Sequence, residues 1–457
     1  MYCKNAWLKY SKSGLNELMD FNEDYKEFLS ASKTEREFVK NSVALAEKYG
    51  YKDISTFKTL KPGDKVYATN MKKNFAAFLI GNEPIVDGLN ILGAHIDSPR
   101  IDVKANPLYE KDGYALFDLH YYGGIIKYQW TATSLAIYGV VIKTDGTTVE
   151  INIGDNPEDP VFTISDLLVH LSADKLSKTA AHAVEGEDLD LTVGHMALTE
   201  EKDAVKNNIL KLLNEKYGIT EEDFVSAELE IVPEGKARDL GFDRSMIIGY
   251  GHDDKICAYT SLRALLDTKE VSRTSSAYLV DKEEVGSIGA TGAQSDWYFN
   301  VVAELIALQN NGNYNELMLK RCLTKTYMLS SDVSAGYDPI YSSVFEPKNS
   351  SYLGKGLTFN KYTGARGKSG CNDAMPEYVA KIRKIMDDNN IAYQTAELGR
   401  VDQGGGGTIA YIMGNKGMNV IDAGVPVLSM HAPQEVVSKV DVYEAYLGYM
   451  AFVKNIK

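Results

Sequence analysis

The sequence has no long hydrophobic run. None of its apolar stretches approaches the roughly 18 residues that a membrane-spanning helix needs, although apolar residues make up 44% of the 457-residue chain. The N-terminus, MYCKNAWLKYSKSG, is too polar for a signal peptide. We therefore expect a cytoplasmic globular protein with no membrane partner.

Basic residues are in the minority. Lys and Arg total 49 against 63 Asp and Glu, so the formal net charge is -14. A nucleic-acid or anionic-membrane partner requires a basic face, and this balance argues against one. We interpret the acidity as a contribution to solubility and expect no nucleic-acid partner.

Cysteine is scarce and scattered. The four cysteines, Cys3, Cys257, Cys322 and Cys371, show no CxxC spacing. This argues against a Cys-type zinc site and a disulfide framework, so we interpret them as reduced thiols. Any metal in this protein must therefore be held by histidine and carboxylate side chains.

The residue pattern changes twice along the chain. Residues 34–49 have the apolar spacing of an amphipathic helix, and 75–96 predict two strands around a Gly-Asn turn. Between about 104 and 235, short alternating segments predict antiparallel strands, with one helical stretch at 201–217. After residue 245, strand candidates alternate with helix candidates, as in an α/β protein.

The length of the chain favours one large domain plus a smaller one. We predict an α/β domain formed by residues 1–103 and 236–457. A smaller, mostly β domain at 104–235 would be inserted into it.

Side chains that commonly bind metals follow several predicted strands. In an α/β sheet, ligands bind beyond the carboxyl ends of the strands. Residues of this kind follow the runs ILGA, SMIIGY, AYLVDK, YMLSS and VPVLSM; they are His95 and Asp97, Asp253 and Asp254, Glu283 and Glu284, Asp332, and His431. Their recurrence indicates one pocket lined by nitrogen and oxygen. Zinc takes imidazole and carboxylate ligands, and two metals roughly 3.5–4 Å apart can share a hydroxide.

Two of these motifs also have a plainer interpretation. GAHIDSP could be an exposed loop in which His and Asp are neighbours, whereas beside a metal Asp97 would orient His95. Asp253 and Asp254 could be a solvated helix start, where the helix dipole favours acids. The five histidines other than His95 and His431 are interpreted as surface or core residues; His252, beside Asp253, is one of them.

DKEEVGS is the more specific motif. Two acids directly after a buried strand are unfavourable unless they are paired or bind cations. One of the two, Glu283 or Glu284, can be a ligand while its neighbour acts as the general base.

Five motifs resemble those of the aspartyl aminopeptidase and vacuolar aminopeptidase I family, metallopeptidase family 18, namely GAHIDSP, GHDDKICAYTSLRAL, DKEEVGSIGATGAQS, SSDVS and SMHAP. The resemblance covers nearly the whole chain and indicates a bacterial-type member. It implies a three-layer α/β peptidase domain with a mixed central sheet, interrupted by a smaller β-rich dimerisation domain. It also implies a homo-oligomer, a tetrahedral dodecamer built from dimers.

The resemblance implies roles for the motif residues. Two zinc ions per subunit, replaceable by cobalt or manganese, would be held by His95, Asp253, Glu284, Asp332 and His431. The register of the following Ala-Tyr and Leu-Arg-Ala-Leu selects Asp253, rather than Asp254, as the residue that bridges both metals. Glu283 resembles the general base, and Asp97 the carboxylate that orients His95.

The chain departs from the family pattern at two places. Trp130 is followed by Thr131–Ser134, where the family has an acidic-basic-acidic triplet. After Asp332, this chain has Ala335 and Asp338 where eukaryotic members have two histidines. The preferred N-terminal residue of the substrate, acidic or neutral, therefore stays open.

Three further residues are candidate substrate contacts. His170 resembles a histidine that reaches the partner's active site across the dimer; the alternative is a buried helix histidine. Lys368, in the basic loop GARGKS, could meet an acidic side chain or a peptide carboxylate, or simply be solvated. Gly405, in DQGGGGT, could let backbone N–H groups approach an oxyanion, or belong to a flexible loop.

The predicted function is that of a dinuclear zinc aminopeptidase. A hydroxide bridging the metals, with Glu283 as general base, would remove the N-terminal residue from peptides. The alternatives are a two-metal deacylase of N-acyl amino acids and a non-catalytic assembly protein.

Overall fold

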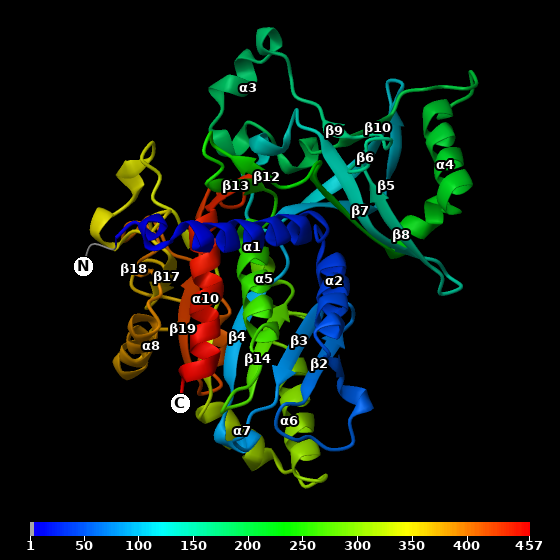
Figure 1. The fold of residues 1–457 in the computed structure, drawn as a ribbon. Coiled ribbons are helices and arrows are strands. Elements are labelled where there is room, and N and C mark those ends of the chain that lie inside the picture. The colour runs from blue at the N-terminus through cyan, green and yellow to red at the C-terminus, as the bar shows by residue number, and fades with distance from the viewer. Residues whose placement is uncertain (1–3) are drawn as a thin grey trace. The chain divides into compact units, whose positions relative to one another are not determined.

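The computed structural model describes residues 4–457, which form two compact units (Figure 1). Among the described residues, the first unit comprises 4–97, 237–430 and 435–457, and the second comprises 98–236 and 431–434. Cys3 lies outside the described residues, and the three other cysteines are free thiols. No helix within 4–457 is both long and apolar enough to cross a membrane.

A nine-stranded sheet forms the centre of the first unit. Its strands, in spatial order, are β1 (Lys52–Asp53), β2 (Lys65–Asn70), β3 (Asn74–Leu79), β14 (Ser275–Val280), β4 (Asn90–His95), β15 (Tyr327–Ser330), β19 (Asn419–Gly424), β17 (Leu357–Asn360) and β18 (Tyr393–Ala396). The central strands β14, β4, β15 and β19 are parallel to their neighbours in this run, whereas β3 is antiparallel to β14 and β17 to β19. The sheet is therefore mixed.

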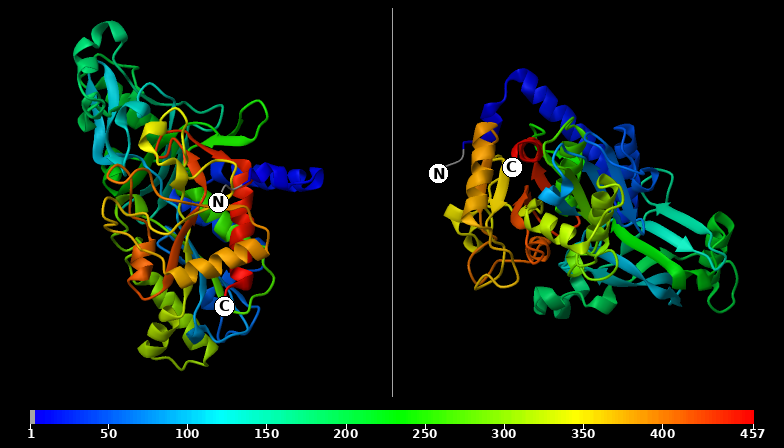
Figure 2. Two further views of the ribbon diagram at one scale, coloured as in Figure 1. Left: turned by 90° about the vertical axis from the view of Figure 1, so that its left-hand side faces the viewer. Right: turned by 90° about the horizontal axis from the view of Figure 1, so that it is seen from below.

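Helices cover both faces of this sheet, which makes three layers (Figures 1 and 2). Successive strand residues face opposite sides, and Leu92 and Leu279 belong to one buried core while Ile91 and Tyr278 belong to the other. The first core includes residues of α1 (Lys12–Ser30), α2 (Glu35–Lys48), α5 (His252–Leu266), α8 (Pro376–Asp388) and α10 (Lys439–Asn455). The second core includes residues of α6 (Trp297–Gln309), α7 (Glu316–Thr324) and α9 (Ala410–Gly414).

A smaller five-stranded sheet completes the first unit. Its strands, in spatial order, are β12 (Arg238–Leu240), β13 (Met246–Gly249), β21 (Glu435–Ser438), β20 (Pro426–Leu428) and β16 (Ser334–Ala335). β13 leads into α5, and β16 follows β15 closely in the chain. This sheet therefore connects segments that adjoin the carboxyl ends of the central strands.

The second unit is built on a seven-stranded antiparallel sheet. Its strands, in spatial order, are β8 (Thr148–Ile153), β7 (Leu135–Ile142), β11 (Ala227–Pro233), β5 (Arg100–Lys111), β6 (Tyr114–Tyr122), β10 (Leu191–Gly194) and β9 (Thr163–Ile164). It also contains α3 (Ala173–Ser177) and α4 (Ala204–Tyr217). Leu167, Leu168, Val169 and Leu171 form an exposed apolar run on this unit.

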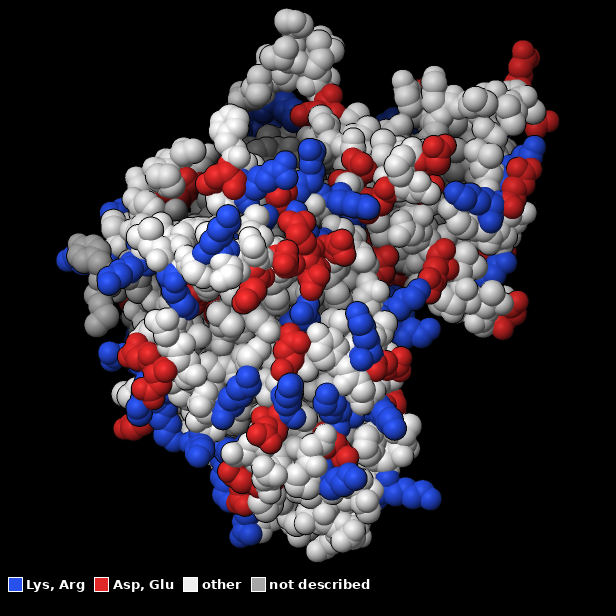
Figure 3. All heavy atoms as spheres, in the orientation of Figure 1, with Lys and Arg blue, Asp and Glu red and all other residues white. Residues whose placement is uncertain are grey.

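Acidic and basic side chains are interspersed on the face of the molecule shown in Figure 3. Many lie in opposite-charge pairs, such as Lys26 with Asp239 and Arg263 with Asp24. Mixed surface charge of this kind favours solubility.

Candidate metal centre

The candidate site begins where β4 ends. β4 is buried along its length and lies parallel to both β14 and β15, so the carboxyl ends of three strands meet at one edge of the sheet. His95 is the last residue of β4, Glu283 and Glu284 follow β14, and Asp332 follows β15. The topology therefore brings residues that are far apart in the sequence to one place.

The two ring nitrogens of His95 face different groups. Nδ1 lies 3.0 Å from the backbone oxygen of Asp97 and 3.2 Å from its Oδ1. Nε2 lies 3.2 Å from Asp253 Oδ1, 3.9 Å from Asp332 Oδ1 and 4.0 Å from Glu283 Oε2. Because one nitrogen contacts an orienting carboxylate, the other is directed at the remaining acids, as in metal-binding histidines.

Asp97 also contacts the segment that carries the two glutamates. Its Oδ1 accepts a hydrogen bond from the backbone N–H of Glu283 at 3.1 Å, and its Oδ2 accepts one from that of Glu284, also at 3.1 Å. The carboxylate is fully buried. Asp97 therefore fixes the ends of β4 and β14 relative to each other.

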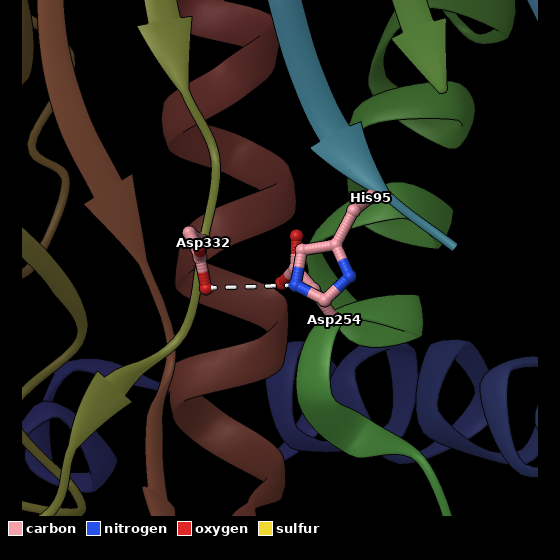
Figure 4. Close-up of side chains that lie close together, drawn as sticks. All are labelled: His95, Asp254 and Asp332. Carbon is pink, nitrogen blue, oxygen red and sulfur yellow. Dashed lines mark ion pairs between the residues drawn. The ribbon is translucent and has the colours of Figure 1, made fainter. Parts of the chain in front are cut away.

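The start of α5 supplies two further acids. Asp253 and Asp254 are both buried, and the backbone N–H of Asp253 donates to Glu435 Oε2 at 2.9 Å. In Figure 4, Asp254, His95 and Asp332 point toward one another from α5, the end of β4 and the segment after β15. Ligand atoms of these three residues lie within 4.8 Å of one another, as do those of His95, Glu283 and Glu284.

Crowding of buried acids changes the proton affinities at this site. Burial raises the pKa of Asp332 well above its usual value, and the charges of Asp254, Asp253 and Glu283 raise it further. Burial also raises the pKa of Asp254. For His95, burial acts to lower the pKa, but Asp253 and Asp97 outweigh it, and the pKa is raised. A bound cation would relieve this repulsion between carboxylates.

The donor set fits zinc. An imidazole nitrogen and several carboxylate oxygens are ligands that zinc takes. Among the described residues, Cys257, Cys322 and Cys371 are free thiols and do not belong to the groups of candidate ligands. The side chains of Glu283 and Asp332 are 16% and 13% exposed, so these two carboxylates are partly accessible to solvent.

Within the first unit, the structure brings six predicted residues together, namely His95, Asp97, Asp253, Glu283, Glu284 and Asp332. His431 follows Met430, the last residue of a first-unit segment, and is grouped with the second unit, where its Nδ1 lies 2.8 Å from the Gly124 backbone oxygen. Its role as a ligand stays a prediction.

His252 is not part of these groups. It is fully buried, its Nδ1 lies 2.7 Å from the Tyr25 hydroxyl, and burial lowers its pKa to about 3. It is therefore a neutral core histidine, as the sequence analysis expects. Asp254 was named beside Asp253 as a candidate but was not chosen as a ligand, because the family register selects Asp253. Glu435 was missed, because an acid at the start of a strand carries no metal-specific spacing.

The candidate substrate residues lie in three different settings. His170 is exposed in a short 3-10 helix, Val169–Leu171, so the alternative of a buried helix histidine is wrong. Lys368 pairs with Asp373 at 3.1 Å and borders a cavity of about 110 Å³.

Gly405 has a packing reason to be glycine. Its φ is +110°, and a Cβ there would lie 2.4 Å from the Ala365 Cα atom. Gly404 is equally confined, because its Cβ would lie 1.7 Å from the Leu398 oxygen. The glycine-rich loop is thus packed against its neighbours, and a contact of Gly405 with substrate stays a prediction.

A three-layer α/β unit with histidine and carboxylates at the carboxyl ends of its parallel strands defines a metallohydrolase. Residues 28–453 match the family model described as aminopeptidase I zinc metalloprotease (M18). The chain belongs to this family and is a metalloaminopeptidase. This confirms the resemblance, the α/β fold class and the predicted enzyme class.

The comparisons with individual proteins agree. The chain is 57% identical to a probable M18 family aminopeptidase 1 of Clostridium acetobutylicum, over 99% of this chain and 98% of that protein. It is similar to the crystal structure of an M18 family aminopeptidase from Thermotoga maritima, with a TM-score of 0.96, 45% identity and full coverage of both chains. The fold also resembles the S. cerevisiae mApe1 dodecamer, with a TM-score of 0.77 at 19% identity, over 96% and 97% of the two chains. These findings favour an aminopeptidase over a deacylase or a non-catalytic assembly protein.

Proposed function

We propose that this metalloaminopeptidase binds two zinc ions per subunit and uses Glu283 as its general base. The observation that supports this most directly is the convergence of buried and partly buried carboxylates on His95 Nε2, with ligand atoms in two overlapping groups within 4.8 Å. Both groups include His95; one adds Asp254 of α5 and Asp332 after β15, and the other adds Glu283 and Glu284, which follow β14. One cation could not engage all of these oxygens with good geometry, whereas a pair could.

The proposed ligands are those named from the sequence: His95, Asp253, Glu284, Asp332 and His431. The orientation of His95 supports its role, since Asp97 contacts the opposite ring nitrogen. Asp253 is proposed as the bridging residue because its Oδ1 lies nearer to His95 Nε2 than the carboxylate oxygens of Asp332 and Glu283 do. Bound zinc supplies Lewis acidity, which polarises a carbonyl oxygen and lowers the pKa of water.

Proton transfer is proposed to be carried out by Glu283. The Glu283 carboxylate takes a proton from the attacking water and returns it to the leaving amine. Its partly exposed side chain reaches the edge of the ligand group, 4.0 Å from His95 Nε2. Asp97 holds the backbone of Glu283 and Glu284, so the base and the neighbouring ligand keep a fixed spacing.

The assembly proposed for this chain is a homo-oligomer, a dodecamer built from dimers, in the cytoplasm. The exposed apolar run Leu167–Leu171 supports it, because clustered apolar side chains of this kind usually mark an interface. His170 lies in that run and is proposed to reach a partner's active site. The inserted β-rich segment at 104–235 would thus serve dimerisation.

Glu283→Gln tests the proposed base. The amide keeps the shape of the side chain but cannot accept the proton, so we expect kcat to fall by roughly 10²–10⁴-fold with two metal ions still bound per chain. Glu284→Gln is the matched control one residue away, and should lower metal content. Turnover that persists in Glu283→Gln with full metal content would contradict the role of Glu283.

Which N-terminal residue of the substrate the enzyme prefers, acidic or neutral, requires a separate experiment. Kinetics of the metal-defined enzyme on aminoacyl substrates with Asp, Glu, Leu, Met and Lys would assign it. Lys368 and Gly405 are the substrate contacts to compare in that panel.

A further inference from the structure

The loop that carries Glu283 and Glu284 is short and conformationally constrained. Lys282 and Ser287 both have left-handed backbone conformations, with φ of 68° and 59°. The backbone N–H of Ser287 donates to the Lys282 oxygen at 2.6 Å. Such conformations are unfavourable for residues other than glycine, so surrounding contacts must maintain them.

The loop is closed at its base by a side-chain hydrogen bond. Asp281 directly follows β14, and its Oδ2 accepts from the Thr291 hydroxyl at 2.6 Å. Both residues are buried, Asp281 to 1% exposure and Thr291 to 6%. Asp281 also forms a bridge with Gly292. The contact therefore joins the two ends of the segment that presents the glutamates.

The β2–β3 hairpin holds the same end of the loop. Asn70 Nδ2 donates to the Ala290 oxygen at 2.9 Å, and Asn74 Nδ2 donates to the Thr291 oxygen at 2.6 Å. The hairpin can do this because β3 is antiparallel to β14, so that its first residue lies beside the carboxyl end of β14. Two amides thus fix two consecutive carbonyls of the loop.

A buried charge cluster lies behind this closure. Lys73, in the hairpin turn, is 7% exposed, and its Nζ lies 3.4 Å from Oε2 of Glu35, the first residue of α2. Burial raises the pKa of Asp281 to about 7, Glu35 adds to this and Lys73 opposes it, so both charges act on Asp281. Buried charges are unfavourable, and their grouping around one carboxylate indicates a specific role.

We propose that Asp281, Thr291, Asn70 and Asn74 are positioning residues that hold the Glu283 loop in its active conformation. The proposal rests on the proposed function, because it assumes that Glu283 acts at this site. None of the four residues belongs to the ligand groups. Each acts through the backbone of the loop, so the effect of losing one should fall on proton transfer more than on substrate binding.

Thr291→Val tests the closure, since valine keeps the shape and removes the hydroxyl. We expect kcat to fall by about tenfold or more, with KM changed less than twofold. Backbone amides of residues 282–292 should exchange with deuterium at least about fivefold faster. Thr291→Ser keeps the hydroxyl and should restore both values.

Thr268→Val is the matched control. Thr268 is also buried, and its hydroxyl donates to the Ala264 oxygen at 2.7 Å, outside the loop. The proposal is overturned if Thr291→Val and Thr268→Val have equal effects on kcat and on exchange of residues 282–292, or if Thr291→Ser fails to restore them.

Asn70→Ala provides a second variant in case Thr291→Val does not fold. Asn70 is partly exposed at the end of β2, so the fold should tolerate its loss. Faster exchange of residues 282–292 is expected, and unchanged exchange would overturn the proposal. Exchange is measured without turnover, so this result stands apart from the Glu283→Gln test, which alone decides the proposed base.

Discussion

Asp97 shows how much one side chain can organise. Its two carboxylate oxygens accept hydrogen bonds from consecutive backbone N–H groups, and Oδ1 also lies beside His95 Nδ1. Three groups from two strands therefore share one buried carboxylate. The spacing of His95 and Asp97 predicts their contact, but the contacts of Asp97 with Glu283 and Glu284 depend on β14 lying next to β4.

Replacing Asp97 separates its two roles. In Asp97→Ala, both the His95 contact and the two amide contacts are lost, so we expect zinc affinity and kcat each to fall by about 10–100-fold. Asp97→Asn keeps one acceptor oxygen and should fall less in both. The check is metal titration followed by kinetics on the metal-loaded protein; wild-type affinity in Asp97→Ala would contradict the role.

Proton release on metal binding follows from the raised pKa values of the site. Burial, with Asp254 and Asp253 nearby, raises the pKa of Asp332, so without metal this carboxyl holds its proton to higher pH. Metal ligands must be deprotonated, and zinc therefore displaces protons. Affinity should increase with pH, by about tenfold per pH unit for each proton displaced.

Calorimetric zinc titrations in two buffers of different ionisation enthalpy measure this release. The apparent binding enthalpy should differ between the buffers near neutral pH. Equal enthalpies, together with equal affinities at pH 6 and pH 8, would show that the acids are already ionised.

Among residues, those with a distinctive type and spacing could be predicted. His95 ends a buried strand, and Glu283 and Glu284 follow another; polar side chains at such places are unfavourable unless they are paired or bind a cation. The role of Asp281 could not be recognised, because it comes from packing near α2 and the β2–β3 hairpin, which are distant in sequence.

Strands and helices with strong patterns were predicted well. The alternation of strands and helices expected after residue 245 is confirmed, because that region contains β14, β15, β17, β20, α5, α6 and α8. The pairing of strands was not predictable, because β14 lies between β3 and β4 although β4 ends at His95 and β14 begins only at Ser275. That insertion is what places the two glutamates beside His95.

Strand β19 supports the site through a glycine. A Cβ at Gly424 would lie 1.7 Å from the backbone oxygen of Asp332. Gly424→Ala must therefore displace the segment that carries this proposed ligand. We expect a loss of zinc affinity of about tenfold or more, measured by metal titration of the folded protein.

Gly367→Ala is the control for this substitution. A Cβ at Gly367 meets no atom within 4 Å, so zinc affinity should stay at the wild-type value. Equal affinity in Gly424→Ala and Gly367→Ala would show that Asp332 tolerates the displacement.

At the scale of the whole molecule, the amino-acid composition excluded classes of partner but did not indicate the function. The net charge of -14 argued against a nucleic-acid partner. Nothing in composition could indicate an oligomer, because the exposed apolar run at Leu167–Leu171 looks in sequence like a core segment. Only its exposure in the structure identifies it as a candidate interface.

Val169→Asp tests that interface. Val169 is 69% exposed, so a charge there should not disturb the fold of one chain but should weaken association. Analytical ultracentrifugation should show the wild type at about twelve times the chain mass of 50.5 kDa, and the variant as smaller species. Leu8→Asp, at another exposed apolar residue, should leave the mass unchanged; an unchanged mass for Val169→Asp would place the interface elsewhere.

Proteolytic cleavage in the turn of the β2–β3 hairpin would affect this enzyme without removing any element of its fold. Its turn contains Met71, which is 65% exposed, and both Met71 and Lys72 have positive φ. A trypsin-like protease that cuts after Lys72 would leave β2 and β3 in the sheet but would free the ends that carry Asn70 and Asn74. Such nicked protein would keep its size and its metal while losing turnover, so intact mass on a gel filtration column is not evidence of an active preparation.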